Sequence, residues 1–463
     1  MRPESSVDEI AAGVRAGRIR AVEVANAALE WIAAQNTALG AFTDITRERA
    51  LREAVAVDQQ IARGEDPGPL AGVPYAVKNL FDIENVTTRA GSKINRDDPP
   101  ATRDAVLIQR LQAAGAVLLG GLNMGEYAYD FTGENAHDGP SRNPHDPAHM
   151  SGGSSGGSGT AVAAGLVPLS LGSDTNGSIR VPASFCGLFG LKPTYGRLPR
   201  TGSFPFVDSL DHLGPLTRSV RDLALAYDAM QGPDAADAAC SAGRIEPVTA
   251  GLEAGSEGLR IAVAGGYFRS GGEPAAGAAV DRCAAALGVS REIEIPAAAE
   301  ARAAAYVITT VEGAALHQER LQTRADDFDP DVRDRLLAGA MVPGVWYVRA
   351  QRFRRWFQQE MRRLFEQVDV ILAPATPITA PKIGQKTMVL GGEEMLVRPN
   401  IGLYTQPISL IGLPVVAVPL FGLAPLPIGV QVITPPWRED LALRTAFALE
   451  QAGVASAPVA RPA

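Results

Sequence analysis

The sequence predicts an α/β protein with a large mixed, mostly parallel twisted central sheet covered by helices on both faces. Helical patterns alternate with short apolar runs, which is typical of such folds. AVLIQRLQAAGAVLLGGLN (105–123) is a helical pattern, a stop at Gly115 and a strand, and TAVAAGLVPLSLGSD (160–174) repeats the order. The 463 residues are 46% hydrophobic and 20% charged, which is enough apolar sequence for an extensive core.

The N-terminal region, residues 1–65, is predicted to be helical. SSVDEIAAGVRAG (5–17) offers a serine cap, early acidic residues, apolar residues at three- and four-residue spacing, and a terminal glycine. AVEVANAALEWIAAQN (21–36) repeats the apolar spacing. We therefore expect helices with apolar faces at this end of the chain.

The C-terminal third supplies further elements of the same fold. YVRAQRFRRWFQQEMRRLFEQ (347–367) predicts a long helix, and VDVILAPAT (368–376) predicts the strand after it. The apolar reach 405–433 contains five prolines, so we expect short buried strands and turns there and no membrane helix.

No linker or internal repeat divides the chain, so the sequence predicts one domain over 1–463. Residues 66–215 form its expected core with the chemistry-bearing motifs. Residues 232–300 are rich in alanine, glycine and acids, and are expected to be peripheral and variable. Residues 301–463 are expected to complete the core and the substrate pocket.

Composition argues against several classes of protein. The net charge is −8 and no basic run occurs, so a nucleic-acid partner is not expected. Three scattered cysteines suit neither a disulfide framework nor a zinc site. The start of the sequence has no apolar signal-peptide core, and we expect a cytoplasmic protein. His145 and His149 are the one pair with metal-like spacing, but they lie in a proline-broken stretch, so no metal is predicted.

A glycine- and serine-rich stretch is the most unusual feature of the sequence. Residues 151–159 hold five glycines and four serines and run directly into apolar sequence, which argues against a flexible linker. A nucleotide-binding loop would need a lysine after its glycines, and none follows. The stretch is therefore not explained by its composition alone.

A second motif lies shortly after it, in LGSDTNGSIRVPASFCGLFGLKPTYG (171–196). The loop 174–178 can turn backbone N–H groups toward one point, which stabilises an oxyanion, and Ser178 at its end is a candidate nucleophile. No histidine is placed to activate this serine. Lys78, at the end of the apolar run in GVPYAVKNLFD (72–82), is the candidate base, because a neutral lysine accepts a proton from serine.

These three motifs, in this order, resemble those of the amidase signature family, and the similarity covers nearly the whole chain. The resemblance implies the amidase signature fold and a Ser-cis-Ser-Lys triad without a cofactor. Ser178 matches the serine that is acylated, Ser154 the serine that relays protons, and Lys78 the base. The oxyanion hole of the family matches the backbone N–H groups of Thr175, Asn176, Gly177 and Ser178.

The resemblance also indicates a substrate class. In glutamine-using members an arginine of the long C-terminal helix binds the α-carboxylate, and Arg354 is placed at that position. An aspartate that binds the α-ammonium is replaced here by Gly402, so a small anionic amide without an amino group is expected. Arg354 could instead be one of several solvated helix charges. Asn176 stands where the family commonly has glycine, and we expect it to shape the substrate pocket.

The amino-acid sequence over 173–212 is most similar to that of the carboxybiuret hydrolases of s-triazine and cyanuric acid catabolism, which release ammonia. This implies hydrolysis of 1-carboxybiuret through an acyl-enzyme, and a homodimer, with a further partner in the form of a small helical accessory subunit. A general short-chain amidase is one alternative. Another is a non-catalytic or glutamine-amidase subunit of an amidotransferase-like complex.

Overall fold

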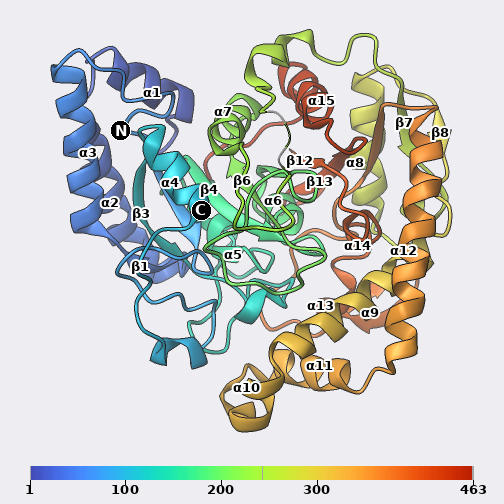
Figure 1. The fold of residues 1–463 in the computed structure, drawn as a ribbon. Coiled ribbons are helices and arrows are strands. Elements are labelled where there is room, and N and C mark those ends of the chain that lie inside the picture. Colours follow the sequence, from blue (N-terminus) through green and yellow to red (C-terminus); the bar gives the residue numbers. More distant parts are fainter. Residues whose placement is uncertain (1, 242, 244, 461–463) are drawn as a thin grey trace.

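An eleven-stranded sheet runs through the described part of the chain, residues 2–241, 243 and 245–460, in this computed structural model (Figure 1). Its strands, in spatial order, are β1 (Phe42–Ile45), β3 (Val117–Leu122), β2 (Pro74–Lys78), β4 (Leu169–Asp174), β6 (His212–Thr217), β5 (Phe189–Lys192), β12 (Val415–Leu420), β13 (Ile428–Ile433), β9 (Val370–Pro374), β7 (Ile261–Ala264) and β8 (Glu292–Ile293). A separate hairpin is formed by β10 (Thr387–Leu390) and β11 (Glu393–Leu396).

The sheet is mixed. Parallel pairs occur in two blocks, β3–β2–β4 and β9–β7–β8. The six remaining neighbour pairs are antiparallel. The predicted α/β class with a mixed sheet is confirmed, but the expected majority of parallel pairs is too high. The reason is that the links β5 to β6 and β12 to β13 carry no crossover helix, so each pair returns antiparallel.

Helices cover both faces of this sheet. Every residue of β2, β3, β4, β12 and β13 is buried, and since alternate side chains of a strand point to opposite faces, both faces are covered. The helices are α1 (Val7–Arg15), α2 (Ala21–Leu39), α3 (Arg47–Ala62), α4 (Val106–Ala113), α5 (Gly156–Ala163), α6 (Arg180–Cys186), α7 (Val220–Met230), α8 (Pro274–Ala286), α9 (Ala298–Leu316), α10 (Gln318–Thr323), α11 (Pro330–Ala340), α12 (Gly344–Phe365), α13 (Val397–Asn400), α14 (Gln406–Ser409) and α15 (Glu439–Gln451).

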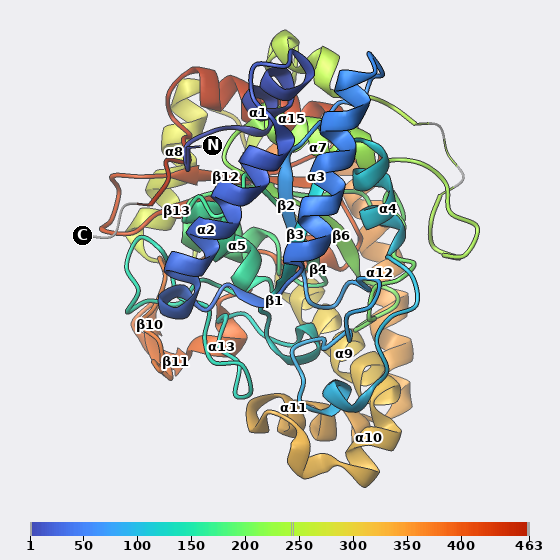
Figure 2. The same cartoon turned by 90° about the vertical axis from the view of Figure 1, so that its left-hand side faces the viewer.

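The N-terminal helices form as their local signals predict. Ser6 caps α1 in a capping box with Glu9, and Gly17 after the helix has a φ of +66°. Helices α2 and α3 lie side by side over β1, β2 and β3 (Figure 2). The region 1–65 is not wholly helical, however, because β1 interrupts it and pairs with β3 at the edge of the sheet.

The C-terminal elements lie toward the end of the sheet opposite to β1. The long helix α12 and the strand β9 form where the sequence predicts them, and the reach 405–433 folds into α14, β12 and β13. Residues 232–300 supply β7, α8 and β8 at the far edge of the sheet (Figure 1). No helix among the described residues is both long and apolar enough to cross a bilayer.

Candidate active site

The candidate catalytic residues gather at the carboxyl ends of two neighbouring parallel strands. Lys78 is the last residue of β2, and the loop 174–178 begins at the last residue of β4. Because parallel strands end at the same edge of a sheet, the pairing places the lysine beside the loop. The glycine-rich stretch leads into α5, which packs against both strands.

Lys78 is fully buried among hydroxyl groups. Its Nζ donates hydrogen bonds to Ser154 Oγ at 2.7 Å, Ser173 Oγ at 2.8 Å and Ser155 Oγ at 3.1 Å. Burial lowers the pKa of Lys78 to about 7, although buried aspartates nearby oppose the shift. The amine can therefore be neutral at physiological pH, as a general base must be.

The glycines of the 151–159 stretch allow the backbone to pack without intervening side chains. A Cβ at Gly153 would lie 2.2 Å from Asp130 Oδ2, and one at Gly157 would lie 2.5 Å from the carbonyl oxygen of Ala41. The peptide bond between Gly153 and Ser154 is cis. The stretch is thus a buried wall beside Lys78, and its second half forms the start of α5.

The loop after β4 is held by a buried ion pair. The Arg180 guanidinium contacts both carboxylate oxygens of Asp174 at 2.9 Å, and both side chains are fully buried. Arg180 holds the pKa of Asp174 well below its usual range, although burial alone would raise it. Asp174 Oδ2 also accepts the backbone N–H of Ile179 at 3.2 Å, so the ion pair closes the loop around residues 175–178.

Four backbone donors of this loop are unused. Within the described chain, the N–H groups at positions 175–178 donate no hydrogen bond, and neither does the Ser178 hydroxyl. Thr175 Oγ1 donates to Asp211 at 2.6 Å, and Thr405 Oγ1 donates to the carbonyl oxygen of Asn176 at 2.6 Å. Gly177 has a φ of +143°, which disfavours any side chain. The loop is therefore rigid, with its N–H groups free to bind an oxyanion.

No hydrogen bond joins Ser154 to Ser178 among the described residues. Lys78 and Ser154 are therefore connected by a hydrogen bond, and Ser178 stands apart from them. Ser178 instead lines a small cavity of about 20 Å³. The residues around this cavity are Ala128, Tyr129, Asp130, Phe131, Thr175, Asn176, Ser178, Phe206, Tyr306, Thr309, Arg335, Pro399 and Gln406.

Arg335, on α11, is the cavity's basic residue. Its guanidinium stacks on the Tyr129 ring, 3.9 Å from the ring centroid, and donates to the Tyr129 carbonyl oxygen. No carboxylate of the described chain forms an ion pair with Arg335. The cavity therefore combines a serine, free backbone donors and an unpaired cation, which suits an anionic carbonyl compound.

Arg354 lies elsewhere. Its Nη2 donates to the Ser209 carbonyl oxygen at 2.8 Å, and the residue does not line the cavity that holds Ser178. Gly402 packs against the cavity wall, where an added Cβ would lie 2.6 Å from Phe131 Cζ. Sequence reasoning did not single out Arg335, because the helical pattern of 330–340 has no mark that distinguishes one arginine from another.

The two histidines with metal-like spacing, His145 and His149, contact different partners. His145 Nε2 lies 3.0 Å from the Cys186 carbonyl oxygen, whereas His149 Nδ1 lies 2.9 Å from Asp146 Oδ2. Among the residues that the structure describes, no group of three or more histidine, cysteine or acidic side chains is arranged to hold a metal ion.

Comparison with known proteins gives consistent results. Residues 23–443 match the Amidase family. The chain is 57% identical over 452 residues to AtzE, a 1-carboxybiuret hydrolase subunit of Pseudomonas sp. strain ADP, covering 96% of this chain and 98% of the relative. It is 38% identical to a subunit of the glutamyl-tRNA(Gln) amidotransferase of Azotobacter vinelandii, covering 96% of both chains.

Among solved structures, a chain of a vestigial protein complex that reveals the evolutionary origins of an s-triazine catabolic enzyme superposes with a TM-score of 0.97 at 57% identity, covering 98% of this chain and all of the other. The 6-aminohexanoate cyclic dimer hydrolase superposes with a TM-score of 0.86 at 29% identity, covering 98% of both chains in its complex with substrate. The fold, the motifs around Lys78 and Ser178, and a family match over most of the length agree: this chain is a member of the amidase signature family of amide hydrolases.

Proposed function

We propose that the protein hydrolyses a terminal amide of 1-carboxybiuret, with release of ammonia, through an acyl-enzyme on Ser178. The observation that carries the proposal is the cavity, which brings Ser178, the free backbone N–H groups and the unpaired Arg335 together. The relative of 57% identity is a 1-carboxybiuret hydrolase subunit, which supports this choice of substrate.

The proposed reaction begins with attack of Ser178 Oγ on the amide carbon. The proton of Ser178 passes to Ser154, and Ser154 passes its own proton to the neutral Lys78 amine, 2.7 Å away. The relay closes on substrate binding, when the hydroxyl groups come within hydrogen-bond reach. The carbonyl oxygen gains negative charge and is stabilised by the free N–H groups of the loop.

Collapse of the tetrahedral intermediate breaks the C–N bond. The protonated lysine returns its proton through Ser154 to the leaving nitrogen, and ammonia departs. A water molecule then attacks the carbamate formed on Ser178, while Ser154 and Lys78 accept its proton and return one to Ser178 Oγ. This step frees the carbamic acid and restores the enzyme.

Arg335 is proposed to bind the carboxylate of the substrate. Arg335 Nε and Nη2 already donate to the backbone carbonyl oxygens of Asp331 and Tyr129, so Nη1 and the second N–H of Nη2 are the donors left for the carboxylate. Arg354, which the family resemblance indicated for this role, is instead proposed to hold the segment around Ser209 in place through its carbonyl oxygen. An α-ammonium binder is not needed for a substrate without an amino group.

The reaction is expected to depend on pH through Lys78. Only the neutral amine accepts a proton, and burial lowers the pKa of Lys78 to about 7. We therefore expect kcat/KM to rise about tenfold per pH unit well below pH 7 and to level off above about pH 8. A pH–rate profile, with the stability of the enzyme checked at each pH, measures this. A rate that still climbs tenfold per unit near pH 10 would contradict a buried neutral lysine.

Biuret tests the proposed substrate, because it has the same terminal amide but no carboxylate. We expect ammonia release from 1-carboxybiuret to exceed that from biuret by roughly 10- to 150-fold in kcat/KM, the range of one charged hydrogen-bonded contact. An assay of ammonia with both compounds measures the ratio. Equal rates, or a preference for long acyl amides, would reject the substrate and leave the amidase chemistry intact.

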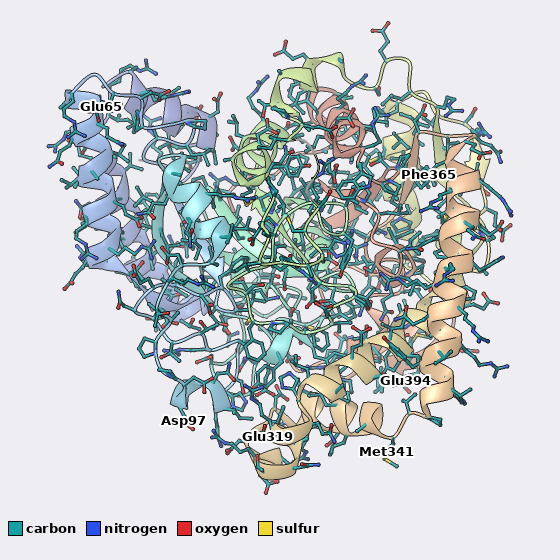
Figure 3. The ribbon with its side chains drawn as sticks, viewed as in Figure 1. Glu65, Asp97, Glu319, Met341, Phe365 and Glu394 are labelled. Atoms are coloured by element: carbon teal, nitrogen blue, oxygen red, sulfur yellow. The ribbon has the colours of Figure 1, made fainter. Side chains whose placement is uncertain are left out.

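Assembly into a homodimer, with a further partner in the form of a small helical accessory subunit, is also proposed, together with the cytoplasmic location expected from the sequence. The related solved structure is a protein complex. Large apolar side chains are exposed around the turn between α11 and α12, where Met341 lies at the end of α11 (Figure 3). They are Leu337, Met341, Val345, Trp346 and Val348. Light scattering of the purified chain measures its assembly; a fully active monomer would contradict it.

A further inference from the structure

The side chain of Asn176 carries a hydrogen-bond acceptor that the chain itself does not use. Asn176 is 6% exposed and lines the cavity of Ser178. Its Nδ2 donates to Thr309 Oγ1 on α9 at 2.7 Å, whereas its Oδ1 is buried and has no hydrogen-bond partner in the described chain. A buried acceptor without a partner costs free energy, so its retention indicates a ligand that completes it.

The position of this acceptor limits which ligand atom it can meet. The backbone N–H of Asn176 belongs to the loop that faces the reacting carbonyl, so its side chain lies within one side-chain length of that carbonyl. Asn176 shares the cavity with Arg335, whereas Lys78 and Ser154 do not line it. The leaving nitrogen must receive its proton from Ser154. The acceptor therefore faces the other substituent of the carbonyl carbon, on the carboxylate side.

We infer that Asn176 Oδ1 accepts a hydrogen bond from an N–H group attached to the reacting carbonyl on the side that stays with the enzyme. The inference rests on the proposed function and narrows its substrate class to ureides, in which that atom is nitrogen. The amide of an ordinary carboxylic acid has a methylene group at this position. A methylene cannot donate a hydrogen bond, so the acceptor stays unsatisfied. Carboxybiuret carries the required N–H between its two carbonyl groups.

Thr309 positions the acceptor. Since Nδ2 is engaged by Thr309, the amide plane is held in place, and Oδ1 is the amide atom left for a ligand. Thr405 Oγ1 donates to the backbone carbonyl oxygen of Asn176. This bond holds the backbone of Asn176, and the backbone in turn fixes where its side chain starts. Thr310, the next residue on α9, donates to the Val307 carbonyl oxygen of its own helix and provides a matched control.

Two stable ligands differ only at the atom in question. N-carbamoylglycine and succinamate are both small anions with a terminal amide, and the first has N–H where the second has a methylene. Their dissociation constants are to be measured by calorimetry on Ser178→Ala protein, with and without Asn176→Leu. We expect the ureide to bind about tenfold more tightly than succinamate, and this ratio to fall to about one in the Asn176→Leu protein.

Further variants keep the test decisive. Asn176→Gly, which introduces the residue common in the family, should also abolish the preference, and it covers the case in which leucine does not fold. Thr309→Val should reduce the preference, and Thr310→Val should leave it unchanged. Binding of both ligands with an unaltered ratio in the Asn176 variants would overturn this role while leaving the proposed function standing. Failure of both ligands to bind would overturn the anionic ureide pocket as well.

Discussion

Ser178→Ala is expected to lower kcat for amide hydrolysis by roughly 10⁴- to 10⁶-fold, because the acyl-enzyme cannot form without the Ser178 hydroxyl. Lys78→Ala is expected to be nearly as damaging, since the buried amine that contacts Ser154 is the proposed base. Ser154→Ala should cost less, because a water molecule can partly replace a hydroxyl in the relay. Steady-state ammonia release measures all three variants.

The three residues are proposed to act as one unit, so the effects of their substitution should not add. Ser178→Ala combined with Lys78→Ala should be no slower than Ser178→Ala alone. Ser158→Ala is the matched control, because Ser158 lies in the same glycine-rich stretch but donates to the Leu171 carbonyl oxygen, away from Lys78. It should retain activity within a few-fold. More than a few per cent of wild-type kcat in Ser178→Ala would show that the nucleophile lies elsewhere.

Arg335→Met is expected to lower kcat/KM for an anionic substrate by roughly 10- to 150-fold, since a charged hydrogen bond to the carboxylate is worth about 1.5–3 kcal/mol. For neutral biuret the loss should be no more than about threefold, because no contact with a charge is removed. Methionine retains most of the volume of the side chain and its packing on the Tyr129 ring. Rates with both substrates measure the difference.

Arg354→Met provides the comparison that separates the two arginines. Because Arg354 contacts the Ser209 carbonyl oxygen and does not line the cavity, its loss should affect charged and neutral substrates about equally. A selective loss for the anionic substrate in Arg354→Met, with no selectivity in Arg335→Met, would reverse the assignment. The circular dichroism spectrum of each variant checks that the fold is intact.

Local signals in the sequence account for several elements of the fold. The capping box of Ser6 and Glu9, the glycine stop at position 115 and the amphipathic pattern of 347–367 each act within a few turns of chain. The motif around Ser178 could be recognised in the sequence for the same reason, because a strand end followed by small polar residues is a local pattern. Such features depend little on which distant segments they contact.

Other elements were decided by contacts that a linear pattern does not contain. Helix α5 begins at Gly156, inside the stretch whose composition disfavours helix, and every one of its residues is buried. Glycine has poor helix propensity, but the absence of a side chain at Gly157 lets α5 pack against the backbone of residues 41 and 123. The short strand β1 was missed for a similar reason, since its four residues are stabilised by pairing with β3.

The sequence by itself predicted that this protein is an amide hydrolase. Lys78, Ser154 and Ser178 stand in three motifs that resemble those of one family, and the alternation of helical patterns with apolar runs was enough to predict an α/β fold. Only the tertiary structure decided which cation shares a cavity with Ser178 and where the Asn176 acceptor points. Arg335 lies 157 positions after Ser178, and many arginines lie between them or near them, so no spacing rule selects it. Packing of α11 against the loop that holds Tyr129 makes that selection, because a pocket is formed by segments that meet only when the chain is folded.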